Sequence, residues 1–204
     1  MAIYRDKILP RIIDVAAGTK ELAEWRRRCV EGLHGVVVEP GFGSGLNVPW
    51  YPPEVERVYA IDPAELGQQL AAKRVDQSDV AVDFIGLDGQ DIPLEDDSCD
   101  CGLLTLTLCT IPDADKALSE LRRVIKPGGR LHFLEHGHAP TGSVATWQRR
   151  MEPVQKRVFD GCHLTRKMPE LIAGAGFTID WVDASYAKGP KPLSYFYVGV
   201  ATNP

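Results

Sequence analysis

The sequence predicts an α/β fold: a seven-stranded, mostly parallel sheet with helices on both faces and a C-terminal antiparallel hairpin. Two observations lead to this prediction. Short, nearly continuous apolar segments alternate with helix-like segments as far as residue 136, which is typical of a parallel sheet covered on both faces. The last two apolar segments, 177–186 and 193–202, are joined by only six residues, and so short a connection requires antiparallel pairing.

The order of the elements follows from the spacing of apolar residues. Residues 3–31 are expected to be helical, because Ile8, Ile12, Val15 and Leu22 recur at the spacing of one helix face. The five strands of the parallel part are expected at 35–39, 57–62, 82–88, 99–108 and 130–136. Helices are expected at 64–74 and about 113–125, and the sequence KPGG makes the turn before the fifth strand at 126–129.

The length of 204 residues suits a single domain, 1–204. Residues 1–31 are expected to form a helical lid, and 139–170 a helical segment on the substrate side. In that segment Thr165 is expected to cap the helix that runs through MPELIAGAG, and Trp147, like Tyr51, is a candidate for the pocket wall.

Composition and charge exclude some classes of function. Hydrophobic residues make up 44% of the chain and charged residues 25%, which is ordinary for a globular protein. The net charge of −5 argues against nucleic acid as a partner. Three arginine clusters, at 26–28, 122–123 and 149–150, lie on helix-like segments beside acids and are interpreted as solvated helix faces.

The five cysteines indicate a reducing environment. They form no C-x-x-C pair and no even-numbered framework, so free thiols and a cytoplasmic location are expected. The first residues lack the apolar core of a signal peptide, and no stretch approaches the roughly 18 apolar residues of a transmembrane helix. The oligomeric state has no signature in the sequence.

A glycine-rich loop follows the first expected strand, in VVVEPGFGSG. It has no lysine after its last glycine, Gly45, so it does not fit a P-loop, and its G-x-G-x-G spacing differs from the dinucleotide fingerprint. Glu39 places a carboxylate before the loop, and Pro40 removes one backbone N–H from it. These features disfavour a phosphate and suit a ligand that carries positive charge.

Two further acids end the next strands. Asp62 follows the second strand, where an acid accepts hydrogen bonds from ribose hydroxyls, although it could also cap the helix after Pro63. Asp88 follows the third strand and can accept a hydrogen bond from an adenine amine. Adenine, ribose and a cationic tail without phosphate describe S-adenosylmethionine.

The chain resembles the class I S-adenosylmethionine-dependent methyltransferases over nearly its whole length. Four motifs carry the resemblance in the expected order: VVVEPGFGSG, VYAIDP, LDGQDIPLEDDSCD and LSELRRVIKPGGRLHFLEHG. A Rossmann-like sheet is what this resemblance implies. GSGLNVPWYPP, LEHG and FDGCHLTR are similar to a subgroup that includes membrane-associated animal proteins methylating alkyl thiols, although this chain departs from them by lacking their N-terminal hydrophobic anchor.

The resemblance implies a set of cofactor-binding residues. The glycine loop and its neighbours would hold the methionine end, and these are Glu39, Gly41, Gly43, Gly45 and Asn47. The ribose would lie at Asp62 and Pro63, the adenine at Asp88, Gly89 and Gln90, and the methyl group near Thr105 and Leu106. Tyr4 is a further cofactor contact, because the N-terminal helix of the family often closes over the methionine carboxylate.

The expected function is methyl transfer from S-adenosylmethionine to a small-molecule acceptor, with S-adenosylhomocysteine as product and a thiol among the candidate acceptors. His136, His163 and Asp160 are the candidate bases, although each could instead be structural. No metal is assigned, because His136 and His138 have no acid or cysteine at ligand spacing. Phospholipid, quinone and amine acceptors, and a non-catalytic binding module, remain alternatives.

Overall fold

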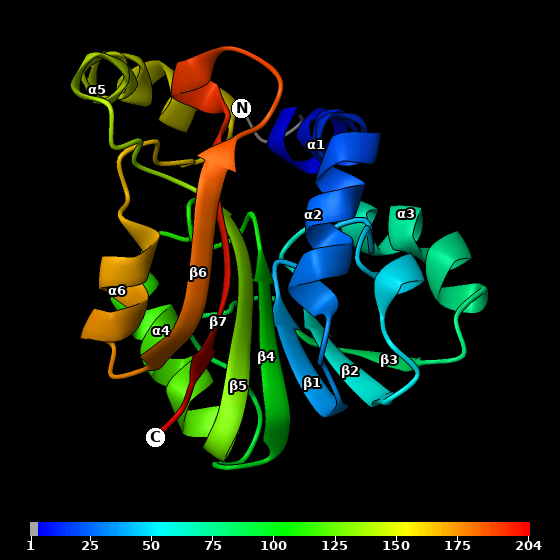
Figure 1. Ribbon diagram of the computed structural model, residues 1–204. Helices are drawn as coiled ribbons and strands as arrows, with labels where there is room; N and C mark the ends of the chain where they lie inside the picture. Colours follow the sequence, from blue (N-terminus) through cyan, green and yellow to red (C-terminus); the bar gives the residue numbers. More distant parts are fainter. Residues whose placement is uncertain (1–3) are drawn as a thin grey trace.

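A computed structural model describes residues 4–204, and it places all seven strands in one sheet. The strands are β1 (Gly35–Pro40), β2 (Val55–Ile61), β3 (Ala81–Gly86), β4 (Cys99–Thr105), β5 (Ile125–His136), β6 (Thr178–Tyr186) and β7 (Tyr195–Thr202). Their order is β3-β2-β1-β4-β5-β7-β6 (Figure 1). The first five strands run parallel, and β7 pairs antiparallel with both β5 and β6. The predicted fold class is confirmed.

Helices cover both faces of the sheet. They are α1 (Leu9–Ala17), α2 (Lys20–Val30), α3 (Glu65–Asp76), α4 (Ala114–Val124), α5 (Gly142–Val158) and α6 (Met168–Gly174), with short turns at Tyr4–Ile8, Val48–Trp50 and Lys191–Leu193. Side chains alternate across the strands, so Val37 and Leu103 pack toward α2 and α3 while Val38 and Leu104 pack toward α4 and α6.

The predicted N-terminal helix is broken in two. Gly18 separates α1 from α2, and a Cβ at Gly18 would lie 2.6 Å from the carbonyl oxygen of Asp14. The Thr19 hydroxyl then accepts a hydrogen bond from the Leu22 N–H and caps α2. Both halves are helical, as expected, but they point in different directions: α2 runs along the sheet, whereas α1 lies at its end (Figure 1).

Two strands end two or three residues earlier than predicted, at the edge where their loops begin. β4 stops at Thr105 instead of residue 108, because Leu106 turns into the left-handed region at φ 57°. β3 stops at Gly86, so Asp88 lies in the loop that follows. These shorter strands leave longer loops at the carboxyl edge of the sheet.

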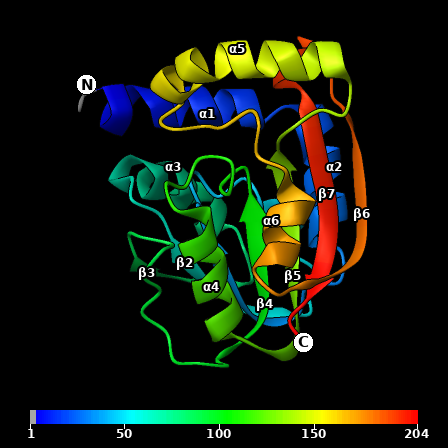
Figure 2. The same cartoon turned by 90° about the vertical axis from the view of Figure 1, so that its left-hand side faces the viewer.

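The sheet reverses its order between β1 and β4. The chain moves outward from β1 to β3 and then returns to β4 on the other side of β1. Loops at such a point part from each other and open a crevice at the carboxyl ends of the strands, where α/β sheets bind ligands. Helices α1 and α5 both lie across this end of the molecule (Figures 1 and 2).

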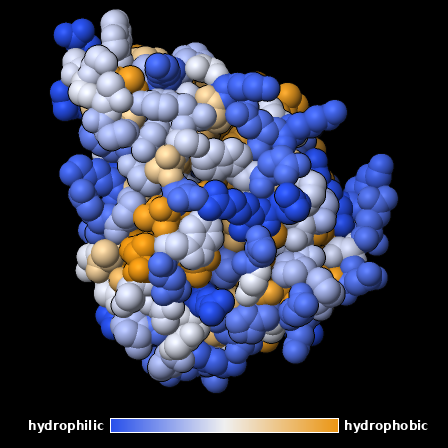
Figure 3. All heavy atoms as spheres, in the orientation of Figure 1, coloured by the Kyte–Doolittle hydropathy of each residue, from blue (hydrophilic) through white to orange (hydrophobic). Residues whose placement is uncertain are grey.

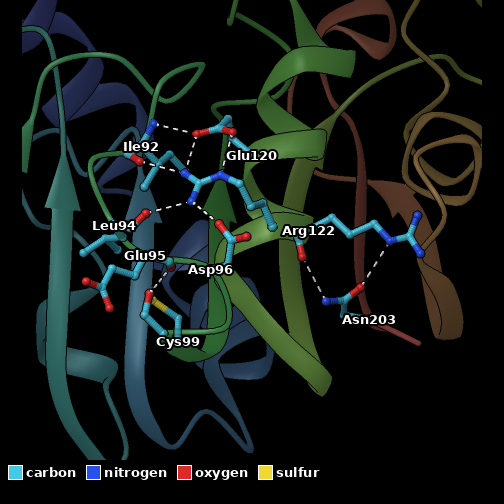
Figure 4. Close-up of polar contacts among 10 residues, drawn as sticks. Ile92, Leu94, Glu95, Asp96, Cys99, Glu120, Arg122 and Asn203 are labelled. Carbon is cyan, nitrogen blue, oxygen red and sulfur yellow. Dashed lines mark hydrogen bonds and ion pairs between the residues drawn. The ribbon is translucent and has the colours of Figure 1, made fainter.

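The interpretation of the arginine clusters as solvated faces is wrong for two residues. Arg26 is buried and donates to the Ala17 carbonyl at 2.6 Å. Arg123 binds Glu120 and the carbonyls of Ile92 and Leu94, so it ties the loop before β4 to α4 (Figure 4). Both guanidiniums thus bond backbone carbonyls.

In the described part of the chain, no helix combines the length and the apolar composition that crossing a bilayer requires. All five cysteines are free and buried. The roles of 1–31 as a lid and of 139–170 as a substrate-side segment stay predictions.

Candidate active site

The three loop glycines adopt backbone conformations that other residues rarely adopt. Gly41, Gly43 and Gly45 have φ of 73°, 57° and 71°. A Cβ at Gly41 would lie 2.0 Å from the Thr107 hydroxyl oxygen, in the loop after β4. At Gly43, by contrast, a Cβ would meet only the Gly41 carbonyl oxygen, at 3.8 Å. The loops after β1 and β4 therefore touch at Gly41, while the backbone at Gly43 borders open space.

The side chain of Asp62 holds the glycine loop by accepting a hydrogen bond from the backbone of the loop. One carboxylate oxygen accepts a hydrogen bond from Gly43 N–H at 2.7 Å, and the other accepts from Ala64 N–H at 2.8 Å. Burial raises the pKa of this carboxyl, and the two backbone bonds oppose the rise. Pro63 next to it is exposed. The bond from Ala64 N–H closes a local turn before α3, but α3 has no side-chain cap; the ribose contact stays a prediction.

Glu39 lies fully buried beneath the loop. Asn47 Nδ2 donates to it at 2.7 Å and also to the Thr105 hydroxyl at 2.8 Å, while the Tyr51 hydroxyl donates to the second carboxylate oxygen. Burial is the largest influence on the Glu39 carboxyl and raises its pKa to about 7. The Asn47 amide thus joins the ends of β1 and β4, and the predicted contact of Glu39 with an ammonium group stays untested.

Asn47 carries a buried acceptor without a partner. Its Oδ1 has no hydrogen bond within the described protein, although the amide nitrogen of the same side chain bonds two partners. Buried polar atoms in proteins are nearly always satisfied, so an orphan of this kind calls for a ligand or water. An acceptor oxygen here fits the N–H groups of a cationic ligand.

Glu135, to which we assign no role from the sequence, fixes the loop after β4. It is fully buried near the end of β5 and accepts hydrogen bonds from the backbone N–H groups of Thr107, Leu108 and Cys109, at 2.8, 2.8 and 3.1 Å. Burial, partly offset by these bonds, raises its pKa to about 7. The sequence signal that could have pointed to this role is an acid within the strand segment RLHFLEH.

Leu106 stands in a strained position in the same loop. Its φ of 57° is uncommon for a residue with a branched side chain, and its N–H donates to the Leu134 carbonyl at 2.8 Å. Strain of this sort clusters at ligand sites and requires support from the surrounding structure. Glu135 supplies that support by holding the residues that follow.

Hydrogen bonds of Asp88 and Gln90 fix the predicted adenine loop. Asp88 is exposed and accepts from the Gln90 N–H and side-chain amide, at 2.8 and 2.9 Å, which lowers the pKa of the Asp88 carboxyl. The side-chain carbonyl of Gln90 accepts from Asp113 N–H at the start of α4. Gly89 is buried, and a Cβ there would lie 2.9 Å from Pro40 Cβ. The loop thus packs against the first residue of the glycine turn.

His136 differs from the other candidate bases. It is buried at the end of β5, its Nδ1 lies 3.9 Å from the Cys162 sulfur, and its Nε2 has no partner in the described structure. His163 instead turns toward Glu152 on α5, with Nδ1 3.5 Å from a carboxylate oxygen, and burial lowers its pKa. Asp160 is exposed in a left-handed turn with φ of 45°. The described contacts thus place His136 against Cys162 and His163 against Glu152.

One expectation for the predicted substrate side is wrong. Thr165 does not cap α6, whose first flanking residue is Lys167; instead the Thr165 N–H donates to Glu152 at 2.9 Å. Trp147 lies on α5 with 55% of its surface exposed, and its role in a pocket wall stays a prediction.

The N-terminal turn and α1 contact both halves of the site. The Tyr4 hydroxyl donates to the Val158 carbonyl on α5 at 3.0 Å, and its predicted contact with the cofactor stays untested. Asp14 of α1 accepts from the Ser44 hydroxyl at 2.6 Å and pairs with Arg74 at 3.0 Å. Ser44 lies between Gly43 and Gly45, so α1 is bonded directly to the glycine loop.

Comparison with known proteins assigns the family. The sequence profile of the methyltransferase domain family matches residues 38–133. The chain is 36% identical to the human thiol S-methyltransferase TMT1B over 182 residues, which are 83% of this chain and 71% of that protein. The chain belongs to the S-adenosylmethionine-dependent methyltransferases. The rat TMT1B is 37% identical over 80% of this chain, which spans 66% of the rat protein's length.

Solved structures of methyltransferases share the fold. An S-adenosylmethionine-dependent methyltransferase from Thermotoga maritima superposes with a TM-score of 0.70 at 21% identity, covering 100% of this chain and 99% of its own. A geranyl diphosphate methyltransferase in complex with S-adenosylmethionine reaches 0.68 at 15% identity, covering 89% of this chain and 84% of its own.

The cofactor of this methyltransferase family is S-adenosylmethionine, and the site suits it. A cationic ligand would find acceptors in the orphaned Asn47 Oδ1 and in the buried carboxylates of Glu39 and Asp62. The backbone at Gly43 borders open space. Within residues 4–204, no group of three or more histidine, cysteine or acidic side chains could hold a metal.

Proposed function

We propose that the protein transfers a methyl group from S-adenosylmethionine to the sulfur of a small thiol. The observation that carries the proposal is the 36–37% identity to the rat and human thiol S-methyltransferases TMT1B over at least 80% of this chain. Quinone C-methyltransferases are more distant, with 29% identity for the Bartonella henselae protein. That difference favours sulfur over a quinone carbon.

A thiol acceptor requires little chemistry from the side chains of the site. When bound, S-adenosylmethionine supplies an electrophilic methyl group, so the protein has only to orient the acceptor and remove its proton. Orientation could contribute roughly 7–11 kcal/mol to lowering the barrier. A thiol, with a reference pKa of about 8.5, needs only a weak base.

His136 is the candidate base in this proposal. Its buried Nε2 has no protein partner among the described residues and can accept the thiol proton, while its ring is held between Cys162 and Phe196, whose ring centroid lies 5.5 Å away. Glu135, one residue earlier, fixes the loop after β4, so base and loop are positioned by the same strand. We further propose a reducing, cytoplasmic setting, which the free cysteines favour.

The test is product analysis by mass spectrometry with an alkyl thiol, an amine, a quinol and a phospholipid as acceptors. We expect a methyl thioether as the main product. His136→Gln should lower the rate about 10²-fold at pH 7, and the deficit should shrink above the thiol pKa of about 8.5, where the thiolate forms unaided. His34→Gln is the matched control, because His34 is exposed and, among the described residues, bonds only the nearby Gly32 carbonyl and Cys101. Methylation of the quinol or amine in preference to the thiol would contradict the proposal.

A further inference from the structure

Two of the five cysteines lie together where the loop after β4 meets the turn at 159–167. The thiols of Cys109 and Cys162 form a hydrogen bond with each other. His136 Nδ1 lies 3.9 Å from the Cys162 sulfur, and the Thr110 hydroxyl lies 3.5 Å from the Cys109 sulfur. The proposed methyl transfer uses neither thiol as a nucleophile.

The backbones of the two segments are close enough for a disulfide. The His163 N–H donates to the Cys109 carbonyl at 2.7 Å, and a Cβ at Gly161 would lie 3.1 Å from the Thr110 carbonyl oxygen. Chains joined by backbone hydrogen bonds lie about 5 Å apart, and a disulfide needs two Cα atoms about 4.4–6.8 Å apart. A disulfide at this place requires little movement of either segment.

The surroundings of the pair make Cys162 the more reactive thiol. The hydrogen bond from the Cys109 thiol, together with the His136 ring, lowers the pKa of the Cys162 thiol in spite of its burial. The same hydrogen bond is the largest influence on Cys109, and with burial it raises the pKa of that thiol. A thiolate attacks an oxidant, and a neighbouring thiol then condenses with the product. Cys162 is thus suited to attack and Cys109 to condensation.

The exposed fractions favour the same residue. The surface of the protein is mainly hydrophilic on the face drawn in Figure 3, and all five cysteines are buried inside the protein. Cys162 keeps 8% of its surface exposed and Cys109 2%, whereas Cys29, Cys99 and Cys101 are at 0%. A small oxidant therefore reaches Cys162 more readily than the other thiols.

We propose that Cys109 and Cys162 form a reversible redox site, in which a hydroperoxide converts the two thiols to a disulfide. The Cys162 thiolate attacks one oxygen of the hydroperoxide and breaks the O–O bond. The oxygen anion that leaves takes up a proton, which gives a sulfenic acid on Cys162 and an alcohol or water. The Cys109 sulfur then attacks the sulfenic sulfur, and the S–O bond breaks with loss of water. The two thiols give up two electrons, and these reduce the hydroperoxide.

The disulfide should slow methyl transfer, and this part rests on the proposed function of His136. A disulfide sulfur has no proton to donate and no negative charge, so His136 Nδ1 loses the thiol that faces it. The new bond would also tie the turn at 159–167 to the loop whose backbone N–H groups Glu135 holds. An oxidant would thus stop the use of S-adenosylmethionine until thiol–disulfide exchange restores both thiols.

The test treats the reduced protein with hydrogen peroxide, blocks free thiols with N-ethylmaleimide and analyses unreduced peptides by mass spectrometry. We expect one linked pair of peptides, which carry Cys109 and Cys162 and are lighter than their sum by two hydrogen atoms. After removal of the peroxide, the initial rate of methyl transfer should be about tenfold or more lower, and dithiothreitol should restore it. Initial rates are compared because an acceptor thiol is itself a reductant.

Variants with one cysteine replaced separate the steps. Cys109→Ser should accumulate a sulfenic acid on Cys162 that dimedone labels, and Cys162→Ser should give no linked peptide. Cys29→Ser is the matched control and should oxidise like the wild type, because Cys29 lies on α2, fully buried, and burial raises the pKa of its thiol. Each variant is compared with its own untreated sample, and titration with S-adenosylmethionine checks its fold.

Three results would overturn the proposal: no linked peptide from the wild type, a linked peptide with an unchanged rate, or an equal loss of rate in Cys162→Ser. If the linked peptide forms but no thiol is methylated even by the reduced protein, the proposed function fails and the redox site stands. The mass readout therefore keeps the two proposals separate.

Discussion

The cofactor side and the acceptor side of the site are built in different ways. On the cofactor side, main-chain groups set the geometry: three glycines have positive φ, Asp62 accepts two backbone N–H groups and Glu135 accepts three. On the predicted acceptor side, contacts between side chains join α5 to the turn at 159–167: the Thr165 hydroxyl donates to Glu152, and His163 Nδ1 lies 3.5 Å from the same carboxylate. His136 there keeps an unpartnered nitrogen within the described structure.

This difference separates what is fixed from what can vary. The cofactor side tolerates few substitutions. Other residues rarely adopt the positive φ of its glycines, and a buried N–H group that loses its carboxylate partner is left without a hydrogen bond. Side-chain contacts on a helix can be exchanged with little effect on the sheet. We therefore expect substitutions to damage the cofactor side more severely than the acceptor side, and the predictions below test that expectation from the largest effect to the smallest.

Gly41→Ala should have the largest effect. The added methyl group would collide with the Thr107 hydroxyl. The alanine would also have to adopt a φ of 73°, which residues with a side chain rarely do. We expect affinity for S-adenosylmethionine to fall at least about 100-fold and the free energy of unfolding to fall by roughly 1–3 kcal/mol. Calorimetric titration and urea denaturation measure the two. Gly174→Ala is the control, because nothing lies within 4 Å of a Cβ there and the residue is helical.

Glu135→Gln should disturb the loop after β4 without unfolding the sheet. The amide nitrogen cannot accept, so at least one of the three backbone N–H groups loses its partner at a cost of about 1–3 kcal/mol. We expect the turnover rate to fall more than the affinity for the cofactor. Glu170→Gln, which loses only an exposed pair with Lys167, serves as comparison, and equal kinetics in the two variants would count against the assigned role.

The buried acid Glu39 should make stability depend on pH in a definite direction. Its pKa is about 7 in the folded protein and about 4.5 when unfolded, so the folded state binds more protons between these values. The free energy of unfolding should therefore fall as the pH rises from about 4.5 to 7, by about 1–3 kcal/mol. Glu39→Gln should flatten the curve, leaving the part with the same sign from Glu135. Urea denaturation at several pH values measures this, and an unchanged slope would contradict it.

Local patterns allowed prediction of the sheet, its terminal hairpin and the glycine loop. Apolar strands between helices are visible residue by residue, and glycine at alternate positions after a strand is typical of a loop with positive φ, which Gly41, Gly43 and Gly45 adopt. The acid that ends β2 was equally visible, and it does hold the loop.

Contacts between distant segments could not be predicted. Asp14 bonds Ser44, Glu135 bonds residues 107–109, and Arg123 bonds the loop before β4. The spacing of apolar residues along the chain carries no information on such long-range hydrogen bonds. The same limit explains the error at Thr165, whose N–H bonds Glu152 on α5 instead of capping α6. The predicted acceptor side depends on contacts of this kind, so the sequence says least about it.

The central claim is that the glycine loop and Asp62 form a site for S-adenosylmethionine. Isothermal titration of S-adenosylmethionine and S-adenosylhomocysteine into the wild type and Asp62→Ala tests it most directly, with NAD as control ligand and Asp83→Ala as control variant, because Asp83 forms only an exposed pair with Arg57. The account predicts micromolar binding of both ligands, no binding of NAD, and a loss confined to Asp62→Ala. Absence of binding to the wild type, or an undiminished affinity in Asp62→Ala, would contradict it.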